Sequence, residues 1–206
     1  MKKNLFELVF ILDASGSMQG FVSDTIGGYN STIEEQRKVE GEALVSTVLF
    51  NGESRVIHDR VPLDQIQAMT TRDYRAAGNT AMLDAIGDAL HHIGNVHKYA
   101  RDEDRPERTI VVIITDGMEN ASRRYSRRRV MEMIKRQRER YGWEFLFLGA
   151  NIEAECVGEQ IGIERERSAT YEQTSAGIDA CYAMMSDAVK EIRERRVKTR
   201  DGWKSK

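Results

Sequence analysis

The chain alternates between short apolar runs and longer segments with a helical repeat of apolar positions. Leu5 to Leu12 is almost continuously apolar, which is typical of a strand covered by helices on both faces of a parallel sheet. Thr109 to Thr115 and Glu144 to Leu148 are further buried runs of this kind. Val22 to Lys38 and Thr80 to Lys98, which lie between these runs, have the spacing of helices. This order of elements predicts parallel β-α-β units in one sheet.

One edge of that sheet is expected to be antiparallel. Ala43 to Phe50 and Ser54 to Val61 are predicted strands, and the dipeptide Asn51-Gly52 between them is a strong hairpin turn signal. Further helices are expected over residues 126–141, 153–161 and 173–196. The predicted fold class is therefore α/β: a doubly wound, mostly parallel sheet with one antiparallel edge strand and helices on both faces.

Length and composition say only a little about domain organisation, partners and location. A chain of 206 residues fits one α/β domain, expected over residues 1–196, followed by a basic C-terminal tail over 197–206. Lys and Arg number 31 against 33 Asp and Glu, so no global charge argues for binding to nucleic acid or to an anionic membrane. Cys156 and Cys181 form no CxxC pair, and no run reaches the ~20 apolar residues of a membrane helix. We therefore expect a cytoplasmic protein with reduced thiols.

Two aspartates directly follow two of the buried strands. Asp13 and Asp116 should meet at one edge of the sheet, because the carboxyl ends of parallel strands share an edge and ligands bind there. Ser15, Ser17 and Thr80 add three hydroxyl groups nearby, so all five side chains are hard oxygen donors. Such a set suits Mg²⁺, with Mn²⁺ or Ca²⁺ as alternatives, better than zinc. Two carboxylates only neutralise a divalent ion, which can then attract a carboxylate from outside.

These residues carry a family resemblance. The segment Asp13-Ala14-Ser15-Gly16-Ser17 resembles the DxSxS motif of von Willebrand factor A (VWA) domains. Gly78-Asn79-Thr80 and Thr115-Asp116-Gly117 resemble the other two parts of that motif, in the same order along the chain. The resemblance covers roughly residues 5–186. Residues 147–151 and 157–163 are more similar to intracellular bacterial and phage-type members than to secreted animal ones.

The resemblance implies a metal ion-dependent adhesion site (MIDAS). In such a site Ser15 and Ser17 would ligate the ion directly, and Thr80 and Asp116 would do so directly or through water. Asp13 would hold waters and orient the serines. The sixth position would go to a Glu or Asp of a protein partner, and the expected partner-binding rim consists of Met18, Gln19, Asn79, Met118, Glu119 and Arg123. The function expected is a metal-dependent protein-binding module.

Two alternatives stay open. A phosphatase-like, metal-dependent hydrolase could use Asp13 as its nucleophile, but Ser15 stands where the haloacid-dehalogenase-like pattern has a second Asp. No histidine or lysine stands in a motif that would make it an acid, base or phosphate clamp, so we expect no enzyme. The helix over residues 122–140 is strongly basic and could bind nucleic acid. We favour a solvated helix face, because the segment offers no run of aromatic residues for stacking on single strands.

Overall fold

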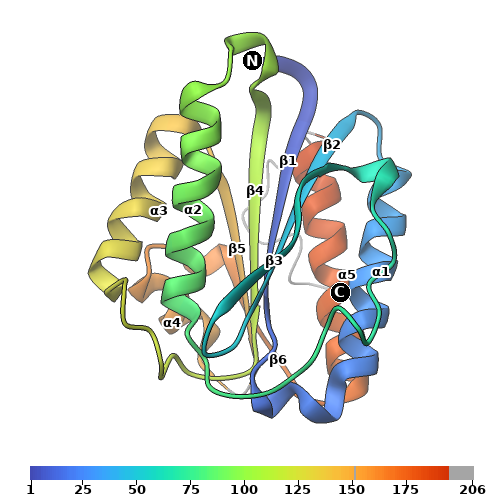
Figure 1. Ribbon diagram of the computed structural model, residues 1–206, viewed down its shortest axis with the longest axis vertical. Coiled ribbons are helices and arrows are strands. Elements are labelled where there is room, and N and C mark those ends of the chain that lie inside the picture. The colour runs from blue at the N-terminus through green and yellow to red at the C-terminus, as the bar shows by residue number, and fades with distance from the viewer. Residues whose placement is uncertain (151, 195–206) are drawn as a thin grey trace.

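The sheet has six strands, and the computed structural model describes residues 1–150 and 152–194 of the chain. The strand order across the sheet is β3-β2-β1-β4-β5-β6 (Figure 1). In chain order the strands are β1 (Lys2–Asp13), β2 (Glu42–Phe50), β3 (Ser54–Pro62), β4 (Pro106–Thr115), β5 (Glu144–Ala150) and β6 (Ser168–Tyr171).

All neighbouring strands pair in parallel except β2 and β3, which form an antiparallel hairpin at one edge. In the central part of the sheet Val9 of β1 lies opposite Ser46 of β2 on one side and Val111 of β4 on the other. The fold class predicted from the sequence, including the single antiparallel edge strand, is confirmed.

Within the described residues, five helices cover the two faces of the sheet. In Figure 1, α1 (Val22–Arg37) and α5 (Ser175–Arg193) lie on one side of it, while α2 (Met82–Tyr99), α3 (Arg127–Tyr141) and α4 (Ala154–Gln160) lie on the other. Short 3₁₀ helices occupy residues 16–21, 63–65, 102–104 and 165–167.

Each face of the sheet has its own apolar core, which explains the continuously apolar central strands. Phe10 and Leu12 of β1 belong to the core under α1 and α5, together with Tyr29 and Tyr182 of those helices. Ile11, between them, faces the other way, into the core under α2, α3 and α4. Successive side chains of a strand point to opposite faces, so a strand buried on both sides is apolar at nearly every position. The exception in β1 is Glu7, which is buried in ion pairs with Arg60 and His97.

Two parts of the sequence prediction differ from the structure. The short strand β6 was not predicted, and the last helix begins at Ser175 rather than near Gln173. β6 has only four residues and follows the charged stretch 164–167, so it lacks the apolar run that identifies the other parallel strands. Residues 195–196, at the predicted end of this helix, and the predicted basic tail over 197–206 lie outside the described residues.

The order of strands places a topological switch point between β1 and β4, where an open parallel sheet usually has a crevice. The chain leaves β1 toward α1 on one face, and it leaves β4, the neighbouring strand, toward α3 on the other face. The loops after these two strands therefore diverge, which is the usual place for a ligand site in an open parallel sheet. Asp13 ends β1 and Asp116 directly follows β4, so both aspartates stand at this switch point, at the lower end of the sheet in Figure 1.

Candidate metal centre

The turn after β1 is built by the DxSxS segment itself. The Ser15 backbone N–H donates to Asp13 Oδ1 at 2.8 Å, which closes a tight turn. Backbone hydrogen bonds tie the turn to its neighbours, from Ala14 N to Phe50 O at 2.7 Å and from Gly16 N to Gly78 O at 2.9 Å. A Cβ on Gly16 would stand 3.3 Å from the Gly78 carbonyl oxygen, so the glycine allows this close approach of two loops.

Three of the five predicted ligands form a continuous chain of hydrogen bonds. The Ser15 and Ser17 hydroxyl oxygens are 3.0 Å apart, and the Ser17 hydroxyl donates to Asp116 Oδ1 at 2.7 Å. The loops after β1 and β4 therefore meet through ligand side chains, although 99 residues separate Ser17 from Asp116.

Asp13 is buried and has both carboxylate oxygens engaged. It is 2% exposed, Oδ1 accepts from the Ser15 backbone, and Oδ2 accepts from the Thr115 hydroxyl at 2.6 Å. The Tyr74 hydroxyl donates to its backbone carbonyl. Through these contacts Asp13 organises the turn that carries the Ser15 and Ser17 hydroxyls.

Thr80 belongs to the third loop and is held beside the other two. Its backbone N–H donates to Asn120 Oδ1 at 2.9 Å, and the Asn120 N–H donates back to the Thr80 carbonyl at 3.0 Å. Its side-chain oxygen lies 3.9 Å from the place where a Cβ on Gly117 would stand. Thr80 is therefore next to the residue that follows Asp116, and the fold brings all five predicted ligands to one edge.

The electrostatics of this edge suit a bound cation. Burial raises the pKa of Asp13, hydrogen bonds from Thr115 and Ser15 lower it, and the nearby Asp116 carboxylate raises it further. Burial likewise raises the pKa of Asp116, against the lowering effect of its hydrogen bonds. A divalent ion would relieve the cost of two ionised carboxylates so close together. Among the described residues no group of three or more His, Cys, Asp or Glu side chains gathers as a metal cluster.

Four of the six predicted rim residues are exposed, and the structure corrects the other two. Gln19, Asn79, Met118 and Arg123 are exposed beside the site loops. Met18 is only 3% exposed, because the 3₁₀ helix over residues 16–21 turns its side chain into the core under α1 and α5. Met18 is therefore not available to a partner.

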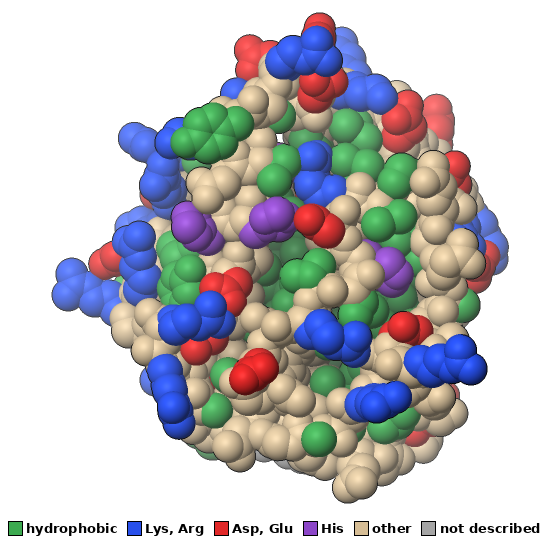
Figure 2. All heavy atoms as spheres, viewed as in Figure 1, with side chains coloured by type: hydrophobic (Ala, Val, Ile, Leu, Met, Phe, Trp, Pro, Cys, Tyr) green, Lys and Arg blue, Asp and Glu red, His purple; other side chains and the backbone are tan. Residues whose placement is uncertain are grey.

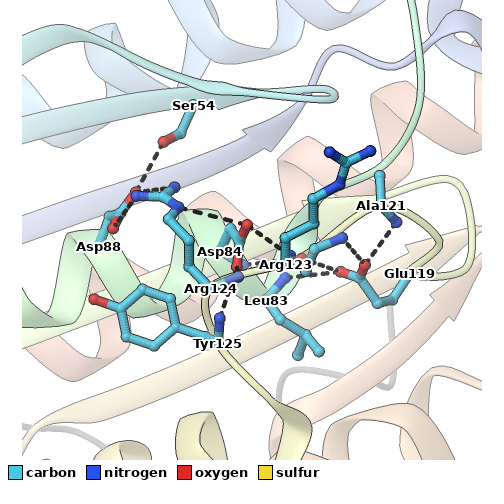
Figure 3. A network of polar contacts seen from close by, with 10 residues as sticks. Ser54, Leu83, Asp84, Asp88, Glu119, Ala121, Arg123, Arg124 and Tyr125 are labelled. Carbon is cyan, nitrogen blue, oxygen red and sulfur yellow. Dashed lines mark hydrogen bonds and ion pairs between the residues drawn. The ribbon is translucent and has the colours of Figure 1, made fainter.

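Glu119 is the second correction, because its carboxylate is turned inward (Figure 3). It accepts from the backbone N–H groups of Leu83 at 2.9 Å, Ala121 at 2.9 Å and Ser122 at 2.7 Å, and from the Ser122 hydroxyl at 2.8 Å. Leu83 lies in the first turn of α2, where the backbone N–H groups have no partner within the helix. Glu119 thus joins the loop after β4 to the start of α2 and is not free to meet a partner.

Sequence reasoning gave no role to three residues that support the site. Thr115 and Asn120 flank the Asp116 loop, and their hydrogen bonds hold Asp13 and Thr80. Gln173, in the loop between β6 and α5, donates its side-chain amide to Asp116 Oδ2 and to the Ser17 carbonyl at 3.4 Å. The position of Thr115 at the end of a strand was a usable signal. Gln173 had none, because β6 was not predicted.

Comparison with solved structures shows the same fold over most of the chain. Proximal thread matrix protein 1 from the mussel byssus, solved with a zinc-occupied MIDAS motif, is 16% identical with a TM-score of 0.62; the match covers 91% of this chain and 46% of that one. The manganese-loaded TRAP protein of Plasmodium vivax is 16% identical with a TM-score of 0.57, covering 85% and 72%. The von Willebrand factor domain of the pilus tip protein Mfa5 from Porphyromonas gingivalis is 9% identical with a TM-score of 0.64, covering 89% and 94%. This chain thus spans about half the length of the mussel protein.

Sequence comparison identifies the family. No curated protein matches the chain. None of the helices that the structure describes has the length and apolar character of a membrane-spanning segment. The model of the family described as VWA domain containing CoxE-like protein matches residues 2–144, which include all three parts of the metal motif. The chain therefore belongs to the VWA domain containing CoxE-like family.

Proposed function

We propose that this chain is a metal-dependent protein-binding module. A divalent cation, Mg²⁺ or else Mn²⁺ or Ca²⁺, is held by Ser15, Ser17, Thr80 and Asp116, with Asp13 orienting the serines. The observation that carries the proposal is the 2.7 Å hydrogen bond from Ser17 to Asp116, which joins the loops after β1 and β4 through two predicted ligands. Hydroxyl and carboxylate oxygens are the donors that Mg²⁺ prefers. The zinc-occupied and manganese-loaded sites of the structural relatives support a divalent ion in general.

The partner is proposed to be a protein that offers a Glu or Asp carboxylate. Two protein carboxylates leave a divalent ion without excess negative charge around it, so an outside carboxylate is attracted to a remaining coordination position. The exposed side chains of Gln19, Asn79, Met118 and Arg123 then contact the surroundings of that carboxylate. Arg123 adds a positive charge that favours the approach of an acidic partner.

The geometry argues against the hydrolase alternative. Asp13, the candidate nucleophile, is 2% exposed, and its two oxygens accept hydrogen bonds from Ser15 and Thr115. A nucleophilic carboxylate needs an oxygen directed at the substrate. Asp13 is placed to organise the turn instead.

Thermal unfolding of the wild type and of a Ser15→Ala/Asp116→Ala variant tests the metal site. Each protein is melted with chelator, Mg²⁺, Mn²⁺ or Ca²⁺. An ion present at ~100 times its dissociation constant stabilises the native state by ~2.7 kcal/mol, which raises the midpoint of a domain of this size by roughly 5–10 °C. We expect this rise for the wild type and not for the variant, each compared with its own midpoint in chelator.

A Ser31→Ala/Asp64→Ala variant is the matched control, because both residues are exposed and lie away from the metal loops. This control should respond to the ions like the wild type. A site variant that gains the same stabilisation as the wild type would contradict the assignment of these ligands. Once an ion is found, isothermal titration of the metal-loaded protein with a Glu-containing peptide and with its Gln counterpart tests carboxylate capture, and equal binding of the two peptides would contradict it.

A further inference from the structure

A second concave surface lies at the end of the sheet opposite the metal centre. It is a groove of about 940 Å³ between the C-terminal halves of α2 and α3, where β4 and β5 begin. None of the residues assigned to the metal site lines it. The groove, defined by these elements, is called the α2–α3 groove below.

Basic side chains dominate the α2–α3 groove. Six of them line it: Lys98, Arg105, Arg108, Arg129, Arg136 and Arg140. Two glutamates also line it, but both are engaged elsewhere: Glu144 pairs with Arg167 at 3.0 Å, and Glu107 accepts from the Asn4 backbone at 2.8 Å. Because the whole chain has a formal net charge of -2, the positive charge is concentrated locally.

Four of these six cations have no anionic partner among the described residues. No ion pair forms there at Lys98, Arg108, Arg136 or Arg140, whereas Arg105 pairs with the exposed Asp102 at 3.0 Å. Arg129 stands only 3.8 Å from Glu132, an exposed contact of little strength. In Figure 2 basic side chains project along the flank of the molecule over α3, at the left of the view. The groove thus keeps an uncompensated positive field.

Compensation of helix dipoles explains only part of this pattern. Lys98 and Arg140 lie in the last turns of α2 and α3, where a cation is favoured. Arg129 lies in the first turn of α3, where a cation is disfavoured, and Arg108 lies in β4. Helix stability therefore does not explain why Arg108 and Arg129 lie in the same groove as the other cations.

Aromatic rings accompany the charges. Tyr141 lines the groove and is 57% exposed. Tyr99, the last residue of α2, lies outside the lining but next to the lining residue Lys98; it is 78% exposed, and Lys98 Nζ lies 5.0 Å from its ring centroid. Trp143 lies in the floor and is 4% exposed. Tyr125, the aromatic residue within the basic segment, instead packs its ring against Gly87 of α2. The stacking surface thus comes from residues beyond the basic segment 122–140.

We propose that the α2–α3 groove binds single-stranded nucleic acid. The arginine side chains match phosphate oxygens in geometry, and the exposed tyrosine rings offer stacking surfaces to bases. A groove between two helices admits a single strand, whereas a duplex would meet only its rims. An acidic peptide is favoured less, because Leu90 and Trp143, the large apolar residues of the lining, are buried and offer little surface to a peptide side chain.

Fluorescence anisotropy of a labelled 20-nucleotide oligo-U, titrated with the full chain in chelator, tests the proposal without involving the metal site. A single strand with about four neutralised phosphates gives a slope of log affinity against log salt of about -2.8, so binding weakens ~50-fold from 50 to 200 mM salt. Arg136→Gln/Arg140→Gln should weaken binding and reduce that slope by about 1.4. Tyr141→Ala should weaken binding about fivefold at constant slope, because stacking is insensitive to salt in comparison.

An Arg127→Gln/Arg128→Gln variant is the matched control. It removes two exposed arginines from the same basic segment, but neither residue lines the groove, so binding should stay close to wild type. Equal losses in the groove and control variants, equal affinity for a duplex of the same sequence, or tighter binding of a poly-glutamate peptide would each overturn the proposal. Absence of oligonucleotide binding at 50 mM salt would overturn it as well. Circular dichroism of each variant checks that the fold is retained.

Discussion

At the scale of single residues, Asp84 fixes the path of the chain between β4 and α3. Its carboxylate accepts from three successive backbone N–H groups, those of Arg123, Arg124 and Tyr125, at 2.8–2.9 Å (Figure 3). The Arg124 side chain also contacts Asp84 and pairs with Asp88 at 2.6 Å. A buried carboxylate with this many donors is held in its ionised form. The loop that carries Arg123 and follows Asp116 thus rests on one side chain of α2.

Asp84→Asn should therefore destabilise the protein in a pH-dependent way. Burial raises the pKa of Asp84, but the three backbone donors and the Arg124 charge outweigh it, so the pKa lies below its ordinary value of 3.8. A depressed pKa in the folded state gives stability that is present above pH 4 and is lost as the pH falls through the folded pKa. We expect Asp84→Asn to cost about 2 kcal/mol at pH 7. Urea unfolding at several pH values should show the gap to wild type narrowing below pH 4.

The exposed Asp64 offers the control, since Asp64→Asn should leave the unfolding free energy near wild type at every pH. A gap between wild type and Asp84→Asn that stays constant down to pH 3 would mean that the charge of Asp84 contributes nothing. The loss would then come from hydrogen-bond geometry alone.

Residues of the metal motif were predictable because each one stands directly beside the end of a strand or the start of a helix. Asp13 and Asp116 directly follow continuously apolar runs, which are typical of buried strands. The directions of Met18 and Glu119 were not predictable. Whether a loop side chain faces solvent or protein depends on contacts with distant elements, such as the Leu83 N–H for Glu119.

At the scale of elements, the start of α5 is tied to the candidate metal centre. Thr174 caps the helix by accepting from Gly177 N at 3.0 Å, and Ser175 donates to Asp24 of α1 at 2.9 Å. Just before this cap, Gln173 donates to Asp116 Oδ2, while Ser17 donates to Oδ1 of the same carboxylate. Gln173 therefore sets the rotation of the Asp116 carboxylate, and the position of α5 sets Gln173.

Gln173→Ala should accordingly weaken the affinity for Mg²⁺ about tenfold, because partners that orient a metal ligand typically contribute that much. Isothermal titration with Mg²⁺ gives the affinity, and unfolding in chelator separates it from any loss of stability. The exposed Gln160 at the end of α4 provides the control, and Gln160→Ala should bind Mg²⁺ like the wild type. Unchanged Mg²⁺ affinity in Gln173→Ala would show that Asp116 needs no such support.

The elements that were predicted from the sequence are those whose apolar pattern is set by burial on both faces. β1, β4 and β5 supply such runs, and the Asn51-Gly52 turn marks the hairpin of β2 and β3. β6 is paired with β5 alone, as an edge strand of four residues. Its pairing comes from the neighbouring strand and not from its own composition, which is why no local pattern indicated it.

At the scale of the whole molecule, the candidate metal centre lies where β1 and β4 end, and the α2–α3 groove lies at the opposite end of the sheet, where β4 and β5 begin. The helix α2 connects them: its first turn follows Thr80 and receives the Glu119 contact, while its last turns line the groove. This helix packs against β1 and β2 in a core where Ile86, Leu90 and Ile93 are at most 1% exposed. We expect a helix packed this tightly to keep one position, and therefore not to carry a change from one site to the other.

We therefore expect the two sites to act independently. The affinity for oligo-U should change less than twofold between chelator and Mg²⁺ at equal ionic strength. The Ser15→Ala/Asp116→Ala variant, measured in parallel, shows how much Mg²⁺ weakens binding by screening alone. Sites that share no contacts and lie far apart have additive free energies, whereas coupling of 1–3 kcal/mol would appear as a 5- to 150-fold change. A metal-dependent change in the wild type that the site variant lacks would show that α2 moves as a unit. Both proposed activities would then belong to one switch, with the partner's carboxylate at one end of the helix and the nucleic acid at the other.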